Sequence, residues 1–94
     1  MRFAIRLTPD ALADLEEIHV EDQILAAVAA LARHPRRGAH PGELLALGMR
    51  DYRETLFKPY RIVYSVEGRR VDVYLIADGR RDMQALLSRR LLGA

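Results

Sequence analysis

The chain begins with an alternation of polar and apolar residues, which then gives way to a helical spacing. The alternation predicts a short strand over residues 2–7, with one apolar face formed by Phe3, Ile5 and Leu7. Thr8 follows in the position of a helix N-cap, and Pro9 suits the first helical position, where a missing N–H costs nothing. A helix is therefore expected to begin directly after this strand.

An apolar stripe at spacings of three and four continues from this point to residue 34. The stripe weakens at residues 19–22 and resumes until Pro35, which cannot continue a helix. The pattern predicts two helices at about 9–19 and 22–34. One bent helix over the same residues remains an alternative at this stage.

Residues 35–48 contain two prolines and three glycines and are expected to form a loop with at most one helical turn. Three strand candidates rich in β-branched and aromatic residues follow, at 51–57, 60–66 and 71–77. Residues 67–69, Glu-Gly-Arg, suit the turn between the last two strands. The pattern therefore predicts a meander of three antiparallel strands.

A final helix is expected after Asp82, whose side chain suits the N-cap. Its apolar face contains Met83, Leu86, Leu87 and Leu91, and Arg89 and Arg90 near its end suit the helix dipole. The order strand–helix–helix–three strands–helix predicts one α+β domain over residues 1–94, with an antiparallel sheet and the helices on one face. The residues expected in or near the core are Tyr52, Ile62, Val63, Tyr64, Val73 and Leu75.

Composition narrows the class of protein. Half of the 94 residues are hydrophobic and 30% are charged, as in soluble globular domains. There is no cysteine, so disulfides and thiol catalysis are excluded, and the chain suits a reducing compartment. The N-terminus does not resemble a signal peptide, and no apolar run is long enough to span a membrane. These features predict a cytoplasmic protein without a membrane partner.

The net charge of +2 is small, but it is unevenly distributed. Residues 1–49 contain five arginines and seven acidic residues, whereas residues 50–94 contain ten basic and six acidic residues. An anionic partner is therefore expected to contact the second half of the chain.

Four stretches carry a resemblance to a known family. They are LTPDALADLEEI (7–18), LFKPYRIVY (56–64), YSVEGRRVDVYLI (64–76) and ADGRRDMQALLSRRLL (77–92). In this order they resemble the ParE/RelE superfamily of toxins from bacterial type II toxin–antitoxin systems. The resemblance implies a small cognate antitoxin, ParD-like or of another type, as partner, and a role in plasmid stabilization. It implies no cofactor and no sequence-specific DNA binding by the toxin alone.

The resemblance leaves two targets open, because ParE-type toxins poison DNA gyrase whereas RelE-type toxins cleave mRNA on the ribosome. Cleavage of RNA without a metal needs cations for the phosphate and a group that transfers protons. The resemblance implies that a RelE-type toxin places this group, a tyrosine or histidine, close to its C-terminus. The chain has candidate cations, but no tyrosine, histidine or lysine between residues 80 and 94. We therefore expect a gyrase inhibitor closer to ParE, with an mRNA endonuclease as the alternative. The candidate target- and anion-binding residues are Arg53, Lys58, Arg61, Arg80 and Arg81; as an RNase, the catalytic candidates are Arg53, Lys58, Arg61 and Arg81.

Arg80 and Arg81 directly precede the N-terminus of the last helix, where helix stability favours acidic residues. Together with backbone N–H groups they would suit an anion, either a phosphate or a carboxylate. The alternative is that one pairs with Asp78 or Asp82 and the other is solvated. The histidines, His19, His34 and His40, lack the spacing of a metal motif and are expected at the surface.

Overall fold

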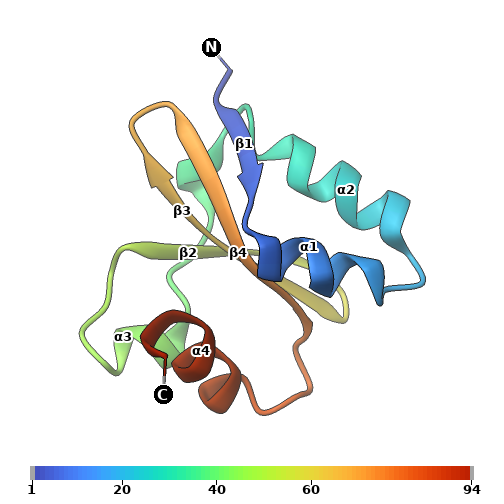
Figure 1. Cartoon of the computed structure of the whole chain (residues 1–94). Coiled ribbons are helices and arrows are strands. Elements are labelled where there is room, and N and C mark those ends of the chain that lie inside the picture. The colour runs from blue at the N-terminus through green and yellow to red at the C-terminus, as the bar shows by residue number, and fades with distance from the viewer. Residues whose placement is uncertain (1, 94) are drawn as a thin grey trace.

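The computed structural model describes residues 2–93 and has one strand, a helical pair, a meander and a last helix (Figure 1). The elements are β1 (Ala4–Leu7), α1 (Pro9–Glu16), α2 (Glu21–Ala30), the 3₁₀ turn η1 (Pro35–Arg37), α3 (Gly42–Leu45), β2 (Tyr52–Phe57), β3 (Tyr60–Glu67), β4 (Arg70–Asp78) and α4 (Met83–Leu92). The expected α+β class and element order are confirmed, and η1 and α3 lie within the predicted loop.

The sheet is mixed rather than wholly antiparallel. Its strand order is β1-β4-β3-β2, and β2, β3 and β4 form the predicted antiparallel meander. However, β1 pairs with β4 in parallel, so the expectation of a purely antiparallel sheet was wrong. The alternation in residues 2–7 is the same for either direction, and the long connection through the helices permits a parallel pair.

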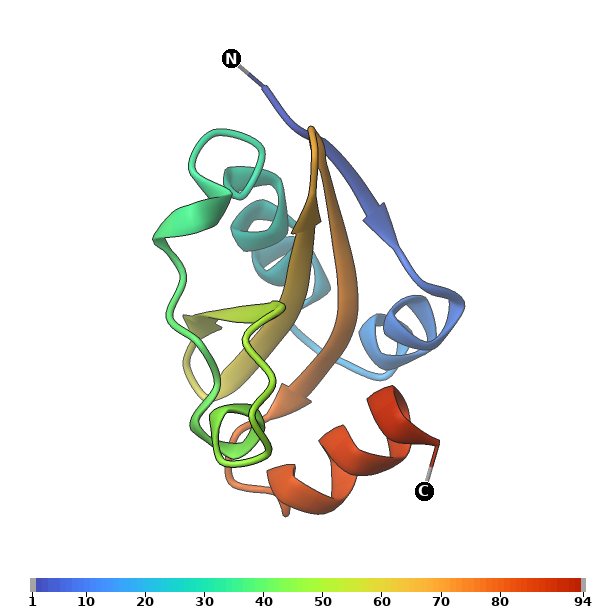
Figure 2. The ribbon, with the colours of Figure 1, turned by 90° about the vertical axis from the view of Figure 1, so that its left-hand side faces the viewer.

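The helices cover both faces of the sheet, which corrects the expectation that they lie on one face. In Figure 2, α1 and α2 lie behind the sheet, whereas α3 and α4 lie at its lower end. Alternate residues of β3 explain this arrangement: Ile62 and Tyr64 pack in the core under α1 and α2, and Val63 packs in the core under α3 and α4. Two apolar faces need two covers, and the order of elements alone does not reveal this.

A β-bulge lies in the middle of the hairpin formed by β3 and β4. Val63 pairs with Leu75 and the next residue, Tyr64, pairs with Val73, so Tyr74 has no opposite residue on β3. The extra residue changes which face the following side chains occupy. As a result Val73 packs in the α1–α2 core, while Leu75 packs in the α3–α4 core.

The predicted core is confirmed. Of the residues expected there, Ile62, Val63, Tyr64, Val73 and Leu75 are at most 1% exposed, and Tyr52 packs partly buried against the α3–α4 core. None of the helices within residues 2–93 is both long and apolar enough to cross a membrane.

The two central helices form a hairpin, which excludes the single bent helix. α1 ends at Glu16 and α2 begins at Glu21, so the break falls where the apolar stripe weakens. Both helices are shorter than predicted; α2 ends at Ala30, followed by turns to Arg33.

The N-cap of α1 provides a test of local stability. Thr8 Oγ1 accepts a hydrogen bond of 3.1 Å from the N–H of Ala11, and Pro9 is the first helical residue. Replacing Thr8 by alanine leaves this N–H without its partner, so we expect the free energy of unfolding to fall by about 1 kcal/mol. Urea denaturation measures this difference. Thr8→Ser keeps the acceptor and should remain close to the parent; equal losses in both variants would contradict a capping role.

Candidate functional site

Lys58, Arg80 and Arg81 lie at one end of the β3–β4 hairpin. The N–H of Gly79 donates a hydrogen bond of 2.7 Å to the carbonyl of Pro59, which joins the β2–β3 turn to the connection before α4. A Cβ atom on Gly79 would lie 2.9 Å from Cδ of Arg61 and 3.2 Å from that carbonyl oxygen, so the two segments leave little space for a larger residue. The sequence predicted that these cations lie at neighbouring basic edges of the sheet, and the structure brings the β2–β3 turn and the connection before α4 together. We call Lys58, Arg80 and Arg81 the basic corner.

Within the basic corner, Arg80 pairs with Asp78. Its Nη2 lies 2.6 Å from Asp78 Oδ2, and the backbone N–H of Arg80 also donates to this carboxylate. The hydrogen bonds from Arg80 lower the pKa of Asp78 to about 2. This is the pairing that the sequence offered as the alternative to anion binding. Among residues 2–93, Lys58 and Arg81 have no carboxylate within 4.0 Å.

Arg61 lies between two carboxylates. Its guanidinium donates to both oxygens of Glu43 at 2.7 and 2.8 Å, and its Nε donates to Glu54 at 2.7 Å. The Arg61 side chain is only 15% exposed. Hydrogen bonds to Glu43 and then to Glu54 raise the pKa of Arg61, and the same contact with Arg61 lowers the pKa of Glu43. In this structure Arg61 fixes α3 to β2 and β3, and its contact with an external anion stays a prediction.

Arg53 also makes contacts that stabilise the fold. Its Nη1 donates to the backbone carbonyls of Arg36 and Gly38, at 3.0 and 2.9 Å, and so supports η1 from β2. The guanidiniums of Arg53 and Arg61 are therefore bound within the fold, whereas the side chains of the basic corner are exposed. A role for Arg53 in target binding is untested and stays a prediction.

Tyrosines are the remaining candidates for proton transfer, because α4 has no such group. Tyr64 is fully buried and its hydroxyl donates to the carbonyl of Pro35. Burial raises the pKa of Tyr64 and of Tyr52, so both hydroxyls stay protonated at neutral pH and release a proton less readily. Tyr74 contacts the ring of Tyr52 edge-on, with ring centroids 5.4 Å apart. The surroundings of these three tyrosines indicate packing roles. Tyr60 differs from them, because it is half-buried and lines a pocket with Asp78 and Arg81 next to the basic corner.

The histidines do not form a metal site in the part of the chain that the structure describes. His19 and His34 are exposed, and Nδ1 of the half-buried His40 lies 3.0 Å from the carbonyl oxygen of Tyr52. No cluster of three or more histidine, cysteine or acidic side chains suitable for a metal ion occurs within residues 2–93.

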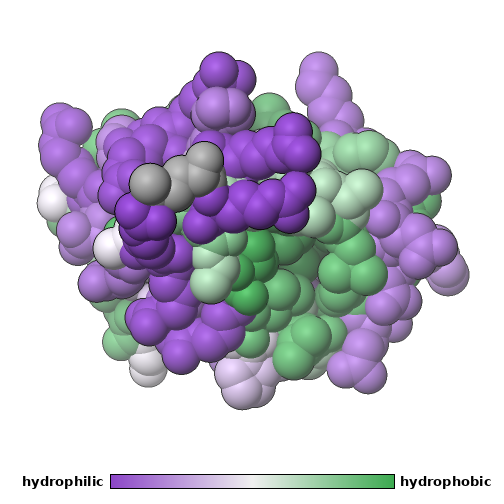
Figure 3. Space-filling view, turned by 90° about the horizontal axis from the view of Figure 1, so that it is seen from above, coloured by the Kyte–Doolittle hydropathy of each residue, from purple (hydrophilic) through white to green (hydrophobic). Residues whose placement is uncertain are grey.

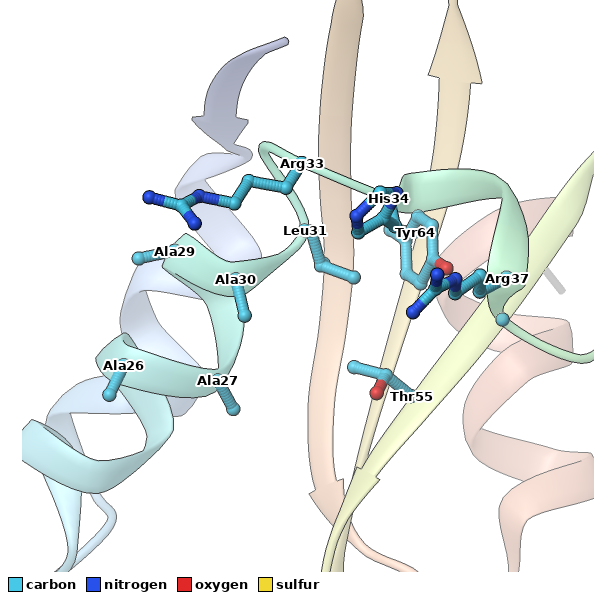
Figure 4. Close-up of a pocket in the computed structure, with 11 residues that line it drawn as sticks. Ala26, Ala27, Ala29, Ala30, Leu31, Arg33, His34, Arg37, Thr55 and Tyr64 are labelled. Atoms are coloured by element: carbon cyan, nitrogen blue, oxygen red, sulfur yellow. The ribbon is translucent and has the colours of Figure 1, made fainter. Parts of the chain in front are cut away.

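A groove of about 640 Å³ lies between α2 and the edge of the sheet (Figure 4). Alanines of α2 and Leu31 form one wall, and Thr55 of β2 lies on the opposite side. Arg33, His34 and Arg37 lie at one end of the groove. In the sequence, these residues carry only the signals of a helix end and a loop.

η1 is held firmly beside this groove. The hydroxyl of Tyr64 binds the carbonyl of Pro35, and Arg53 binds the two carbonyls described above. Gly38 lies so close to Tyr64 that an added Cβ would be 2.1 Å from its hydroxyl oxygen. The turn that presents Arg36 and Arg37 is therefore fixed by buried contacts on its inner side.

Five exposed arginines gather at the end of the molecule that contains η1, the end of α2 and the β3–β4 turn. Hydrogen bonds of 2.8 Å from Phe3 N–H to Ala32 O and from Ala4 N–H to Arg69 O hold these segments together. Figure 3 looks down on this end and shows long hydrophilic side chains beside a hydrophobic patch. We call this set the arginine pole; it consists of Arg2, Arg33, Arg36, Arg37 and Arg69.

The sequence alone does not indicate the arginine pole, because four of its members come from the first half of the chain and Arg69 comes from the second. The segment ARHPRRGAH (32–40), with three arginines and two histidines, was a local signal for part of it. Only the parallel pairing of β1 with β4 brings Arg2 and Arg69 to the same end.

The comparisons with known proteins decide the family. The model of a family described as "ParE toxin of type II toxin-antitoxin system, parDE" matches residues 5–83, which is most of the chain. The chain belongs to the ParE toxin family. No curated protein matches the chain. The family assignment confirms the resemblance found in the sequence. It identifies the chain as a type II toxin, but it does not identify the target of that toxin.

Solved structures confirm the ParE/RelE-like fold of this ParE-family chain. A free double arginine-to-alanine mutant of the E. coli toxin RelE has a TM-score of 0.71, at 17% identity over 92% of this chain and 93% of that chain. The RelBE2 toxin–antitoxin complex from Mycobacterium tuberculosis has a TM-score of 0.63, at 24% identity over 83% of this chain and 99% of the other. The chromosomal ParDE system from P. aeruginosa also has a TM-score of 0.63, at 19% identity over 82% and 96%. These identities establish a shared fold only.

Proposed function

We propose that this ParE-family toxin inhibits growth by binding and poisoning DNA gyrase, and that a cognate antitoxin neutralises it. The observation that carries the choice of target is that α4, which begins beside the basic corner, contains no tyrosine, histidine or lysine. Tyr60 is half-buried and lines a pocket with Asp78 and Arg81, so it is the group that a ribonuclease would have to use there. Tyr52 and Tyr64 have raised pKa values because they are buried. Metal-free RNA cleavage needs a proton-transfer group, whereas inhibition by binding does not.

The basic corner is the surface that we assign to the target. Lys58 and Arg81 are exposed, and Arg80, although paired with Asp78, remains 80% exposed on its side chain. An exposed ion pair of this kind is weak, so Arg80 exchanges Asp78 for a partner's carboxylate at little cost. Arg61 lies against Gly79, beside this surface, whereas Arg53 binds the carbonyls of η1 and Gly38 elsewhere in the molecule.

Two of the similar structures come from toxin–antitoxin pairs: the RelBE2 complex and the ParDE system. This supports a cognate antitoxin as partner here. Expression of the chain alone should stop growth, and co-expression of the neighbouring antitoxin gene should restore it. Strong expression without a growth defect would count against a toxin.

The target is tested with purified protein in two reactions. One contains gyrase, relaxed plasmid and ATP, and the other is a translating extract with a defined mRNA. We expect loss of supercoiling or accumulation of cleaved DNA, with intact mRNA. Arg80→Ala with Arg81→Ala should weaken the effect on gyrase by about tenfold, as expected when charged contacts at an interface are removed.

A matched variant separates this surface from net charge. Arg50→Ala with Arg89→Ala also removes two exposed arginines, which have no carboxylate within 4.0 Å among the described residues. It should inhibit gyrase like the parent. Cut mRNA with normal supercoiling would overturn the proposal and favour the RelE-type activity.

A further inference from the structure

The arginine pole carries a charge that the fold does not neutralise. Two carboxylates lie near the same end: Asp72, which is 2% exposed and bound to Arg6 and Arg70, and Glu67, at the end of β3. Within residues 2–93, neither they nor any other carboxylate lies within 4.0 Å of a nitrogen of the pole's guanidiniums. Five like charges repel each other, so this cluster costs stability unless an anion binds it.

We propose that the arginine pole binds the phosphate backbone of duplex DNA, without reading its sequence. Arginine is the side chain best suited to phosphate, because its planar guanidinium donates two parallel hydrogen bonds to phosphate oxygens. This inference is independent of gyrase as target, because it concerns DNA alone and a surface other than the basic corner.

The distribution of acidic residues gives this contact a direction. The turn between α1 and α2 carries Glu16, Glu17, Glu21 and Asp22, all of them exposed. Helix α2 runs from this turn to the arginine pole, and its ten residues span about 15 Å. The molecule is therefore charged oppositely at the two ends of this helix, which orients it toward a polyanion with the acidic turn facing away.

The pole is also held in place before any ligand arrives. Tyr64 and Arg53 fix η1, and the guanidinium of Arg36 lies 5.3 Å from the ring centroid of Phe3. Arginines that are already restrained lose less conformational entropy on binding, which favours contact with a rigid ligand.

The surroundings favour a duplex over single-stranded nucleic acid. Proteins that bind single strands present aromatic faces on which the bases stack. At the pole, Phe3 lies under Arg36 and Tyr64 is fully buried, so among the described residues there only the exposed imidazole of His34 offers a base an open ring.

An acidic peptide is the competing occupant, because the neighbouring groove has an apolar wall. A peptide in that groove would meet Arg33 and Arg37, which line it, but Arg2, Arg36 and Arg69 lie outside the lining. The whole set of five is explained better by an extended backbone of phosphates than by a segment in the groove.

The test measures binding of the full-length toxin to a fluorescent mixed-sequence duplex of 20 base pairs by anisotropy, over a series of salt concentrations. With four or five phosphate contacts, the logarithm of the binding constant should fall against the logarithm of salt with a slope of about −4. Arg36→Gln with Arg37→Gln should reduce that slope by about 2 and weaken binding at low salt by about tenfold or more. Thermal unfolding monitored by circular dichroism verifies that each variant is folded.

Two controls make the result decisive. Arg50→Ala with Arg89→Ala lowers the net charge equally at the other end of the molecule and should leave the slope near that of the parent; an equal loss would overturn the assignment to the pole. Scrambling the duplex should change nothing, whereas a tenfold preference for one sequence would contradict backbone binding. Absence of DNA binding at low salt would overturn the proposal. If the pole variant weakened antitoxin binding and left DNA binding intact, the acidic peptide would be the occupant instead.

Discussion

Replacing Arg61 by alanine is expected to lower the free energy of unfolding by about 3 kcal/mol. The side chains of Arg61, Glu43 and Glu54 are 15%, 25% and 16% exposed, and the guanidinium makes three hydrogen bonds to the two carboxylates. Without Arg61, two partly buried negative charges would face each other with no counterion. The cost comes mainly from these unpaired charges, because a well-made pair that is removed as a whole costs much less.

The loss is measured by urea denaturation at pH 7. Two further variants identify its cause. Arg61→Met together with Glu43→Gln and Glu54→Gln removes all three charges and should recover much of the lost stability. Arg69→Ala removes an exposed arginine from the β3–β4 turn and should stay within about 0.5 kcal/mol of the parent. If the triple variant were no more stable than Arg61→Ala alone, repulsion between the carboxylates would not be the cause.

The same network makes stability depend on pH. Arg61 lowers the pKa of Glu43 below 4.5, so the folded state binds a proton less readily than the unfolded state. The stabilisation is therefore complete above the unfolded pKa of 4.5 and is lost as the pH falls through the lower folded value. Between pH 6 and pH 3 the parent should lose more stability than Arg61→Ala, which has already lost this pairing.

Replacing Arg90 by alanine is expected to destabilise the fold by about 2–3 kcal/mol, because Arg90 joins α4 to both α1 and β4. Its guanidinium donates to the two oxygens of Asp14 at 2.8 and 3.0 Å and to the carbonyl of Tyr74 at 2.6 Å. Asp14 also accepts the N–H of Ile76, at 3.0 Å. Removal of Arg90, which is 19% exposed, leaves a carboxylate that is 18% exposed without its cation.

Hydrogen exchange of α4 tests where this loss occurs. Amides of Met83–Leu92 should exchange faster in Arg90→Ala through local opening of α4. Amides of β3 should still exchange only by global unfolding. Arg89→Ala is the matched control, since Arg89 is adjacent and exposed and has no carboxylate within 4.0 Å among the described residues. Equal effects of both variants would mean that Arg90 acts only through the helix dipole, as the sequence suggested.

The sequence by itself determined the order and type of the elements. Thr8 with Pro9 and Asp82 are local signals, because a cap acts on N–H groups within three residues, and both caps form as expected. The periods of the apolar residues likewise predicted the meander to within one residue at each end. The family resemblance depends on the same local patterns, and the family match over residues 5–83 confirms it.

Tertiary structure alone decided the direction of β1, the two covered faces and the partners of the arginines. Arg61 is bound by Glu43 and Glu54, whereas Arg81 has no carboxylate partner among residues 2–93. The sequence around each arginine does not reveal this difference. Those partners are 7 and 18 residues away from Arg61, and Asp14 is 76 residues away from Arg90. Charge pairing depends on distance in space, so the arginine pole, assembled from segments in both halves of the chain, exists only once the sheet has formed.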